Sequence, residues 1–154
     1  MAPFAKIARA INQLCVSMPP RPPFPPNDVC FRGGGFDEQF RDFFAPGRQF
    51  RQPAFLATSF SEQVARRFIS RSPMATKILW RVRIDAQHKC RHVNLVRNTN
   101  VPGEDEYLFA PYSAFKVVNA SWRAGTNDQP HEVELYAAID NQGPREDLPL
   151  APWS

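Results

Sequence analysis

The chain has 154 residues, of which 43% are hydrophobic, and it contains thirteen phenylalanines and sixteen prolines. This length and composition suit a single domain with a packed core and irregular edges. The formal net charge of +4 favours acidic or phosphorylated partners, while three cysteines without framework spacing argue against a disulfide scaffold, and no apolar stretch is long enough to cross a bilayer.

The first 26 residues divide into two segments. Residues 1–18 carry apolar side chains at helical spacing, which predicts an N-terminal helix packed on the domain. They lack the apolar centre of a signal peptide, so we expect a soluble protein, although a specialised secretion route would leave no such mark. Residues 19–26, PPRPPFPP, predict a stiff extended connector, or a ligand for a partner's aromatic groove. The domain core should then span residues 27–140, with a C-terminal tail at residues 141–154.

The first predicted strand ends with an arginine, and three glycines follow it. NDVCFR is predicted to be a short buried strand that ends at Arg32. An arginine there is costly to desolvate unless it holds an anion, and glycines let a ligand approach the backbone closely. We therefore expect a phosphate-bearing ligand at this position. The next segment, FDEQFRDFF, predicts a helix with four phenylalanines facing inward: Phe36, Phe40, Phe43 and Phe44.

The remaining elements predict an α+β domain. AFLATSF reads as a strand, and SFSEQVARRFI as a helix that begins with Ser59 and Glu62 at capping-box spacing. Its inner face should carry Val64, Ala65, Phe68 and Ile69. Residues 77–84 alternate with a period of two, and further strands are predicted at HVNLV, EYLFA, AFKVVNA and EVELYAAI. Because no helix is predicted between the late strands, the sheet should be mainly antiparallel.

Two carboxylates precede the apolar strand YLFA. Glu104 and Glu106 are two residues apart, so in an extended chain they share one side. Two carboxylates this close repel each other, which raises the proton affinity of at least one and suits acid, base or cation-stabilising chemistry. The alternative for an isolated ExE sequence is a solvated acidic loop.

Three motifs together favour a chemical role for these carboxylates over a solvated loop. The chain shows FRG from residue 31, FLATSFS from residue 55 and EDEYLFAPYSAFKV from residue 104. In this order they resemble the R-S-E class of mono-ADP-ribosyltransferases, which includes clostridial binary-toxin enzymes and vertebrate arginine-specific ecto-enzymes. The resemblance spans residues 29–118. It implies the ADP-ribosyltransferase fold, in which two small, roughly perpendicular, antiparallel-rich β-sheets form an NAD cleft flanked by helices.

The resemblance also implies roles for individual residues. Arg32 would grip a phosphate and ribose of NAD, and the Gly33 backbone would hold the nicotinamide carboxamide. Glu106 matches the catalytic glutamate, which stabilises the oxocarbenium ion formed as nicotinamide leaves, as a carboxylate does in glycoside cleavage. Glu104 matches the glutamate that orients an acceptor arginine in arginine-modifying members.

The family has a strand with the sequence S-T-S, to which residues 57–59 correspond here, and a helix follows that strand. Two further positions match this helix. Phe68 stands where an aromatic often stacks on nicotinamide, although packing in the core is an equal alternative. Arg71 stands where an arginine reaches the pyrophosphate, although it could equally be one of several exposed arginines.

The S-T-S motif itself departs from the family. Its first serine, whose hydroxyl supports the catalytic glutamate, is Ala57 here, which leaves Thr58 and Ser59. Either Thr58 or Ser59 supplies the hydroxyl, or Glu106 is less firmly held and turnover is lower. Ser59 also has a purely structural interpretation as the helix cap.

The resemblance predicts a monomeric enzyme that transfers ADP-ribose from NAD to an acceptor protein. Arginine is the favoured acceptor residue, threonine and other residues are alternatives, and the loop RNTNVPG is expected to touch the acceptor. We expect no metal, because HKCRH at residues 88–92 lacks a fourth ligand, and no membrane or nucleic-acid partner. An NAD glycohydrolase and a non-catalytic binding module are the alternatives. The short chain suits a bacterial effector or toxin domain that acts in the cytosol of another cell.

Overall fold

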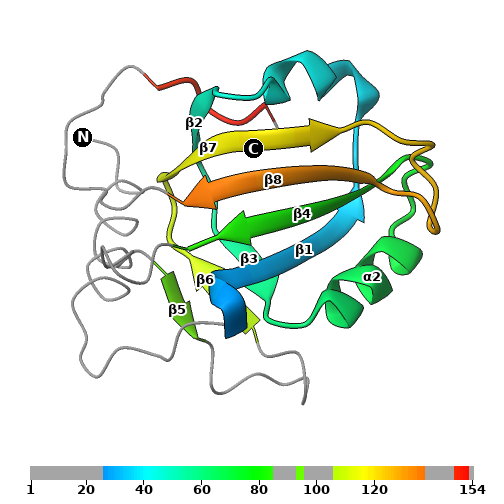
Figure 1. Ribbon diagram of the computed structural model, residues 1–154, viewed down its shortest axis with the longest axis horizontal. Helices are drawn as coiled ribbons and strands as arrows, with labels where there is room; N and C mark the ends of the chain where they lie inside the picture. Colours follow the sequence, from blue (N-terminus) through cyan, green and yellow to red (C-terminus); the bar gives the residue numbers. More distant parts are fainter. Residues whose placement is uncertain (1–25, 85–92, 96–105, 138–147, 153–154) are drawn as a thin grey trace.

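The computed structural model describes residues 26–84, 93–95, 106–137 and 148–152. The predicted N-terminal helix and nearly all of the proline-rich connector lie outside these residues. In chain order the elements are η1 (Pro26–Asp28), β1 (Val29–Gly35), η2 (Glu38–Phe44), β2 (Gln49–Gln52), β3 (Leu56–Ser59), α2 (Glu62–Arg71), β4 (Lys77–Arg83), β5 (Val93–Leu95), β6 (Glu106–Phe109), β7 (Ser113–Ser121) and β8 (His131–Ala137) (Figure 1). The predicted α+β class is confirmed.

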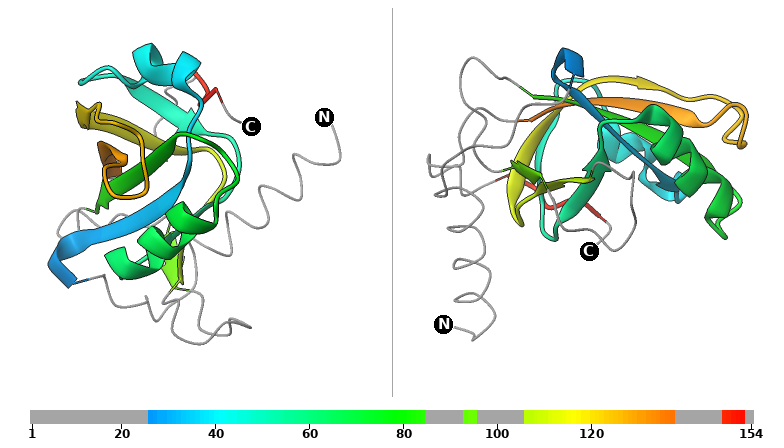
Figure 2. Two further views of the ribbon diagram at one scale, coloured as in Figure 1. Left: turned by 90° about the vertical axis from the view of Figure 1, so that its right-hand side faces the viewer. Right: turned by 90° about the horizontal axis from the view of Figure 1, so that it is seen from below.

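The described strands form one mixed sheet in the order β2-β7-β8-β4-β1-β3-β6-β5. Neighbouring strands are antiparallel except β4 and β8, which are parallel. The prediction of two separate sheets is therefore wrong, because hydrogen bonding continues from β1 to β3 through a single registered pair, Phe31 and Ser59. Strand twist accumulates across such a sheet, and Figure 2 shows the β3-β6-β5 group turned away from the other strands.

Aromatic side chains dominate the core. The ring of Phe44 meets those of Phe50 and Trp80 edge to face, at centroid distances of 5.6 and 5.0 Å, which is a favourable arrangement for aromatic pairs. The predicted inward phenylalanines behave as expected, since Phe36 and Phe44 are buried while Phe40 and Phe43 are partly buried against the core. Their segment forms a 3₁₀ helix, and Asp37 caps it by accepting the backbone N–H of Gln39.

The first strand runs past Arg32 and through all three glycines to Gly35, so the predicted end of the strand at Arg32 is wrong. Helix α2 explains why a glycine is needed at position 33. It crosses β1 so closely that a Cβ added to Gly33 would lie 1.9 Å from the carbonyl oxygen of Ala65 and 2.7 Å from the Cγ1 atom of Ile69. A side chain at this position would force the helix off the sheet.

The fourth strand is buried on both faces at its start. The period of two in the sequence predicts one buried face, yet the residues from Lys77 to Trp80 are all buried. One face packs on the aromatic core, and the other lies under α2, where Leu79 joins Ala65 and Ile69. The buried ammonium of Lys77 donates to the carbonyl oxygens of Ser72 and Met74, so this charge is satisfied at the end of α2.

Residues 148–152 of the predicted C-terminal tail lie along β2, a strand that we did not predict. The backbone N–H of Arg51 donates to Pro149, and the N–H of Ala151 donates back to Arg51. Ala151 is buried in the core cluster. This segment therefore adds to the sheet edge at β2. Among the described helices, none is long and apolar enough to span a membrane.

A buried histidine links η2 to β8. Nδ1 of His131 accepts the backbone N–H of Arg123 at 3.0 Å, so the neutral ring carries its proton on Nε2. Nε2 then donates to the Glu38 carboxylate at 2.8 Å. This bond from His131, followed by the contact with Arg41, lowers the pKa of Glu38 below its ordinary value.

The close contact at Gly33 predicts unequal effects of alanine at neighbouring glycines. We expect Gly33→Ala to lower the free energy of unfolding by at least about 2 kcal/mol, because overpacking against a backbone atom has no flexible neighbour to absorb it. Gly34→Ala is the matched control, since nothing lies within 4 Å of its added Cβ. Urea denaturation measures both, and equal effects would contradict the close contact.

The Glu38 contact predicts a dependence of stability on pH. A carboxylate whose pKa is lowered on folding stabilises the fold above its unfolded pKa of about 4.3, and this contribution disappears as the pH falls through the lower, folded value. We therefore expect Glu38→Gln to flatten the loss of unfolding free energy between about pH 5 and pH 3. Urea denaturation at each pH tests this, and an unchanged slope would contradict it.

Candidate functional site

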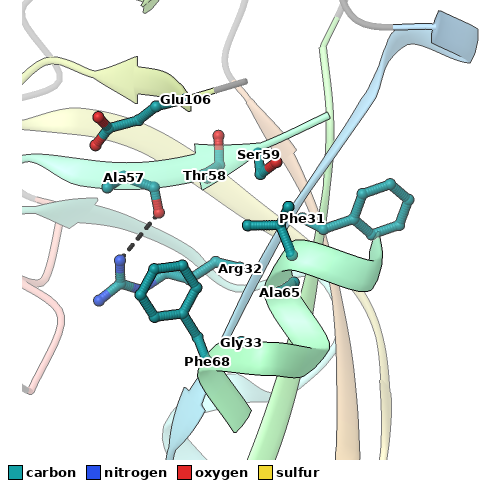
Figure 3. A pocket seen from close by; sticks show the side chains of 10 residues that line it. Phe31, Arg32, Gly33, Ala57, Thr58, Ser59, Ala65, Phe68 and Glu106 are labelled. Atoms are coloured by element: carbon teal, nitrogen blue, oxygen red, sulfur yellow. Dashed lines mark hydrogen bonds between the residues drawn. The ribbon is translucent and has the colours of Figure 1, made fainter. Parts of the chain in front are cut away.

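A pocket of about 180 Å³ opens between α2 and the strands β1, β3 and β6 (Figure 3). It lies where the sheet passes from β1 to β3, so side chains from both strand groups reach it. Its lining residues are Phe31, Arg32, Gly33, Ala57, Thr58, Ser59, Val64, Ala65, Phe68 and Glu106.

The pocket brings together most of the site residues predicted from the sequence. Arg71 lies on α2 but does not line the pocket, and Glu104 lies outside the described residues. The predicted residues that line it are Arg32, Gly33, Thr58, Ser59, Phe68 and Glu106.

Arg32 supplies the positive charge of the pocket. Its Nη1 atom donates to the carbonyl oxygen of Ala57 at 2.9 Å, which orients the guanidinium toward β3. A guanidinium has five N–H donors, so donors remain for an anion. The side chain is exposed, but surrounding protein atoms desolvate the guanidinium and lower the pKa of Arg32 from its ordinary value. An arginine remains charged at neutral pH all the same.

Glu106 supplies the negative charge. It begins β6, is partly exposed, and lies opposite Ser59 in the antiparallel register. Residues opposite each other in such a pair project from the same face. Figure 3 shows the carboxylate of Glu106 above β3, on the side toward which Arg32 extends. The site therefore places a carboxylate and a guanidinium on different walls of one pocket.

The hydroxyls of the ATS motif point in different directions. Thr58 is buried and its Oγ1 atom donates to the carbonyl oxygen of Tyr107 at 2.6 Å. It also contacts the buried thiol of Cys30, whose pKa burial raises to about 12. Ser59 lies on the other face of β3, opposite Glu106, so of the two hydroxyls it is Ser59 that shares the face of the carboxylate.

The sequence pattern predicted Ser59 as the N-cap of α2, and this prediction is wrong. The N-cap is Ser61, whose side chain makes no capping hydrogen bond. Oγ of Ser59 instead accepts the backbone N–H of Ser61 at 3.1 Å. The capping-box interpretation is wrong because the helix begins two residues later than predicted.

The aromatic wall of the pocket comes from α2 and β1. Phe68 is 45% exposed, so its predicted place in the core is wrong. Val64, Ala65 and Ile69 occupy the inner face of α2 instead, and Phe68 projects from the edge of this stripe into the pocket (Figure 3). Phe31, Val64 and Ala65 also line the pocket, although their sequence pattern did not assign them to the site. The spacing of four residues between Val64 and Phe68 was a signal that they share one side of the helix.

Within the part of the chain that the structure describes, no group of three or more histidine, cysteine, aspartate or glutamate residues lies close enough to hold a metal ion. The HKCRH run lies outside that part.

Comparisons with known protein families and with curated sequences find no match. Solved structures do match. The Vis toxin, an ADP-ribosyltransferase from Vibrio splendidus, aligns with a TM-score of 0.63 and 18% identity over 87% of this chain. The catalytic domain of VahC from Aeromonas hydrophila aligns with a TM-score of 0.59 and 16% identity over 88% of this chain. The ATR domain of Salmonella SpvB gives a TM-score of 0.55 and 13% identity over 88%.

The alignments cover 56% of Vis, 70% of VahC and 72% of the SpvB domain, so this chain spans little more than half the length of Vis. Identities this low establish the fold and nothing more. The chain has the fold of bacterial ADP-ribosyltransferases.

Proposed function

We propose that this protein is a mono-ADP-ribosyltransferase, which transfers ADP-ribose from NAD to an acceptor side chain of a target protein and releases nicotinamide. The observation that carries the proposal is the pocket itself. It joins the guanidinium of Arg32, the carboxylate of Glu106 and the exposed ring of Phe68 within a fold shared with ADP-ribosyltransferases. These three groups match the three parts of the reacting end of NAD, which are phosphate, ribose and an aromatic ring.

The reaction calls for a carboxylate beside the sugar. As the bond from the ribose carbon to the pyridine nitrogen breaks, nicotinamide leaves with the electron pair and the sugar becomes an oxocarbenium ion. A fixed carboxylate stabilises this cation more than the neutral ground state, which lowers the barrier. Glu106 would take this role, and Arg32 would hold the phosphate that bears the ribose.

The size of the pocket fits one end of the dinucleotide. Pockets for drug-sized ligands usually measure about 300–1,000 Å³, whereas this one measures about 180 Å³. It suits the nicotinamide and its ribose, with Phe68 stacked on the pyridine and the Gly33 backbone near the carboxamide. The rest of NAD would then extend along the surface, where Arg71, one turn after Phe68, would reach the pyrophosphate.

The nucleophilic side chain of the acceptor would then attack the cationic ribose carbon, form the new bond to it and lose a proton. Glu104 is proposed to orient that nucleophile, with arginine as the favoured acceptor. When no acceptor is held, water captures the same cation, and the protein acts as an NAD glycohydrolase. A secreted effector that acts in the cytosol of another cell is the setting we propose for a monomer of this fold.

A non-catalytic binding module is the second candidate, and Ala57 favours it. The methyl group of Ala57 stands where the family motif has a serine, so one hydroxyl beside the carboxylate is missing. Incubation with NAD and plausible acceptor proteins, followed by measurement of free nicotinamide, decides between the candidates. If the wild-type protein releases no nicotinamide, both enzymatic functions are contradicted.

The proposed role of Glu106 predicts a large loss of rate in Glu106→Gln. We expect nicotinamide release to fall by about 100-fold or more, because the amide cannot offset the charge of the cation. The matched control is Glu134→Gln on β8, which makes the same chemical change away from the pocket lining. Unfolding midpoints of both variants should stay near that of the wild type. Wild-type turnover in Glu106→Gln would refute the assignment.

The register of β3 and β6 predicts that Ser59, rather than Thr58, supports Glu106. A hydrogen bond to a charged group contributes about 1.5–3 kcal/mol, so Ser59→Ala should lower kcat by about 10- to 100-fold. Adding Ala57→Ser to that variant should recover part of the loss, since it restores a hydroxyl on the same face. Because Ser59→Ala also removes the acceptor of the Ser61 N–H at the helix start, its unfolding midpoint is the control, and it should stay near that of the wild type. Unchanged kcat in Ser59→Ala would contradict this role.

A further inference from the structure

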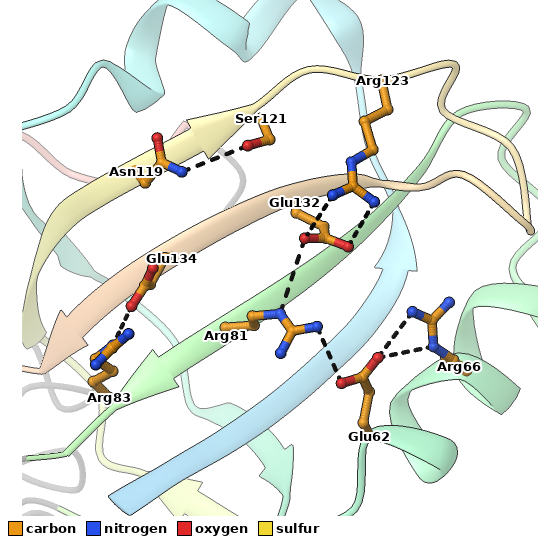
Figure 4. A network of polar contacts seen from close by, with 9 residues as sticks. All are labelled: Glu62, Arg66, Arg81, Arg83, Asn119, Ser121, Arg123, Glu132 and Glu134. Atoms are coloured by element: carbon orange, nitrogen blue, oxygen red, sulfur yellow. Dashed lines mark hydrogen bonds and ion pairs between the residues drawn. The ribbon is translucent and has the colours of Figure 1, made fainter.

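Arg81 lies on β4, on the face of the sheet that α2 covers in part (Figure 4). Its Nη2 atom is 3.1 Å from a carboxylate oxygen of Glu62, in the first turn of α2. Its Nε atom is 4.0 Å from a carboxylate oxygen of Glu132, on β8. One guanidinium thus connects two strands with the start of the helix.

The same guanidinium lies over an aromatic ring of the pocket. Its central carbon is 5.5 Å from the ring centroid of Phe31, the residue opposite Arg81 in the register of β1 and β4. A cation at this distance is attracted by the face of the ring. Phe31 lines the pocket and packs against the cluster formed by Ala65, Ile69 and Leu79. Arg81 therefore contacts a residue of the pocket wall without lining the pocket itself.

We propose that Arg81 is a positioning residue of the pocket, which holds the first turn of α2 and the ring of Phe31 in the places from which they form its wall. The inference rests on the proposed function only in naming NAD as the ligand. It assigns no chemical step to Arg81, which does not line the pocket.

The start of α2 depends on this contact because its usual anchor is missing. A serine at the N-cap commonly accepts a backbone N–H of the first turn, but the side chain of Ser61 makes no such bond. Oγ of Ser59 accepts the backbone N–H of Ser61 just before the helix, and Glu62 adds a side-chain link between the first turn and the sheet, through Arg81. Val64 and Ala65 follow directly and form part of the pocket wall.

An arginine suits this place better than a lysine. Exposed ion pairs contribute little one at a time, about 0–1 kcal/mol each. The planar guanidinium can bond two carboxylates and lie on a ring at once, whereas an ammonium acts as a point charge. Glu132 is itself held by Arg123 at 3.0 Å and Glu62 by Arg66 at 2.8 Å, so the partners of Arg81 are already ordered.

Arg83 offers a matched control on the same strand and the same face. It pairs with Glu134 of β8 and does not line the pocket (Figure 4). The change Arg83→Met therefore removes an arginine, a charge and an ion pair without touching α2 or Phe31.

The experiment compares Arg81→Met, Arg81→Lys and Arg83→Met in two measurements. Without ligand, exchange of the amides of residues 65–68, which donate to the carbonyls of the first turn, should quicken about tenfold in Arg81→Met and stay within about twofold of the wild type in Arg83→Met. With NAD, calorimetry should show a Kd raised about three- to tenfold in Arg81→Met alone, with Arg81→Lys between. In steady-state assays KM should rise more than kcat falls, because Arg32 and Glu106 stand on strands that keep their positions.

The two measurements separate this inference from the proposed function. If the wild-type protein does not bind NAD, the proposed function fails, and hydrogen exchange alone decides the role of Arg81. If Arg81→Met matches Arg83→Met in the exchange of residues 65–68, the inference is overturned whatever NAD does. If exchange quickens but the Kd of a binding-competent protein is unchanged, α2 is held by Arg81 without consequence for the pocket, which also overturns the proposal.

Discussion

The site depends on one close approach, that of helix α2 to strand β1 at Gly33. Without a side chain there, the carbonyl of Ala65 can lie against the strand backbone, and the helix comes down onto the sheet. This brings Val64 and Phe68 beside Arg32, the residue that precedes the glycine. The glycine that allows the packing is therefore also the residue that places an aromatic ring next to a cation, so stability and binding geometry share one constraint.

The narrow junction between β1 and β3 completes the site. A single registered pair joins the two strand groups, and the sheet turns there, so β3 and β6 form a second wall facing α2. Arg32 stands on the first group and Glu106 on the second, which separates the two charges by the width of the pocket instead of letting them neutralise each other side by side. A ligand with an anionic phosphate at one end and a developing cation at the other fits this polarity.

The charges around the pocket are arranged differently from those within it. On the open face of the sheet, arginines and glutamates pair across β4, β8 and α2, as expected for a solvated surface with opposite charges on neighbouring strands (Figure 4). Arg32 donates to the backbone carbonyl of Ala57, a neutral group that orients its charge without neutralising it. Buried His131 makes a separate polar link with the exposed Glu38, which joins β8 to η2.

The sequence by itself determined the order of the three motifs, the α+β class, the positions of most strands, and most of the residues that line the pocket. The fold class and the strand positions follow from the hydrophobic period, whereas most of the pocket residues follow from the resemblance of the three motifs to a known family. Only the tertiary structure decided that the strands form one sheet, that Phe68 leaves the core, and that Ser59 rather than Thr58 faces Glu106. Each of these depends on the register between strands far apart in the chain, and on which face a helix covers, because a shift of one residue moves every side chain to the other side.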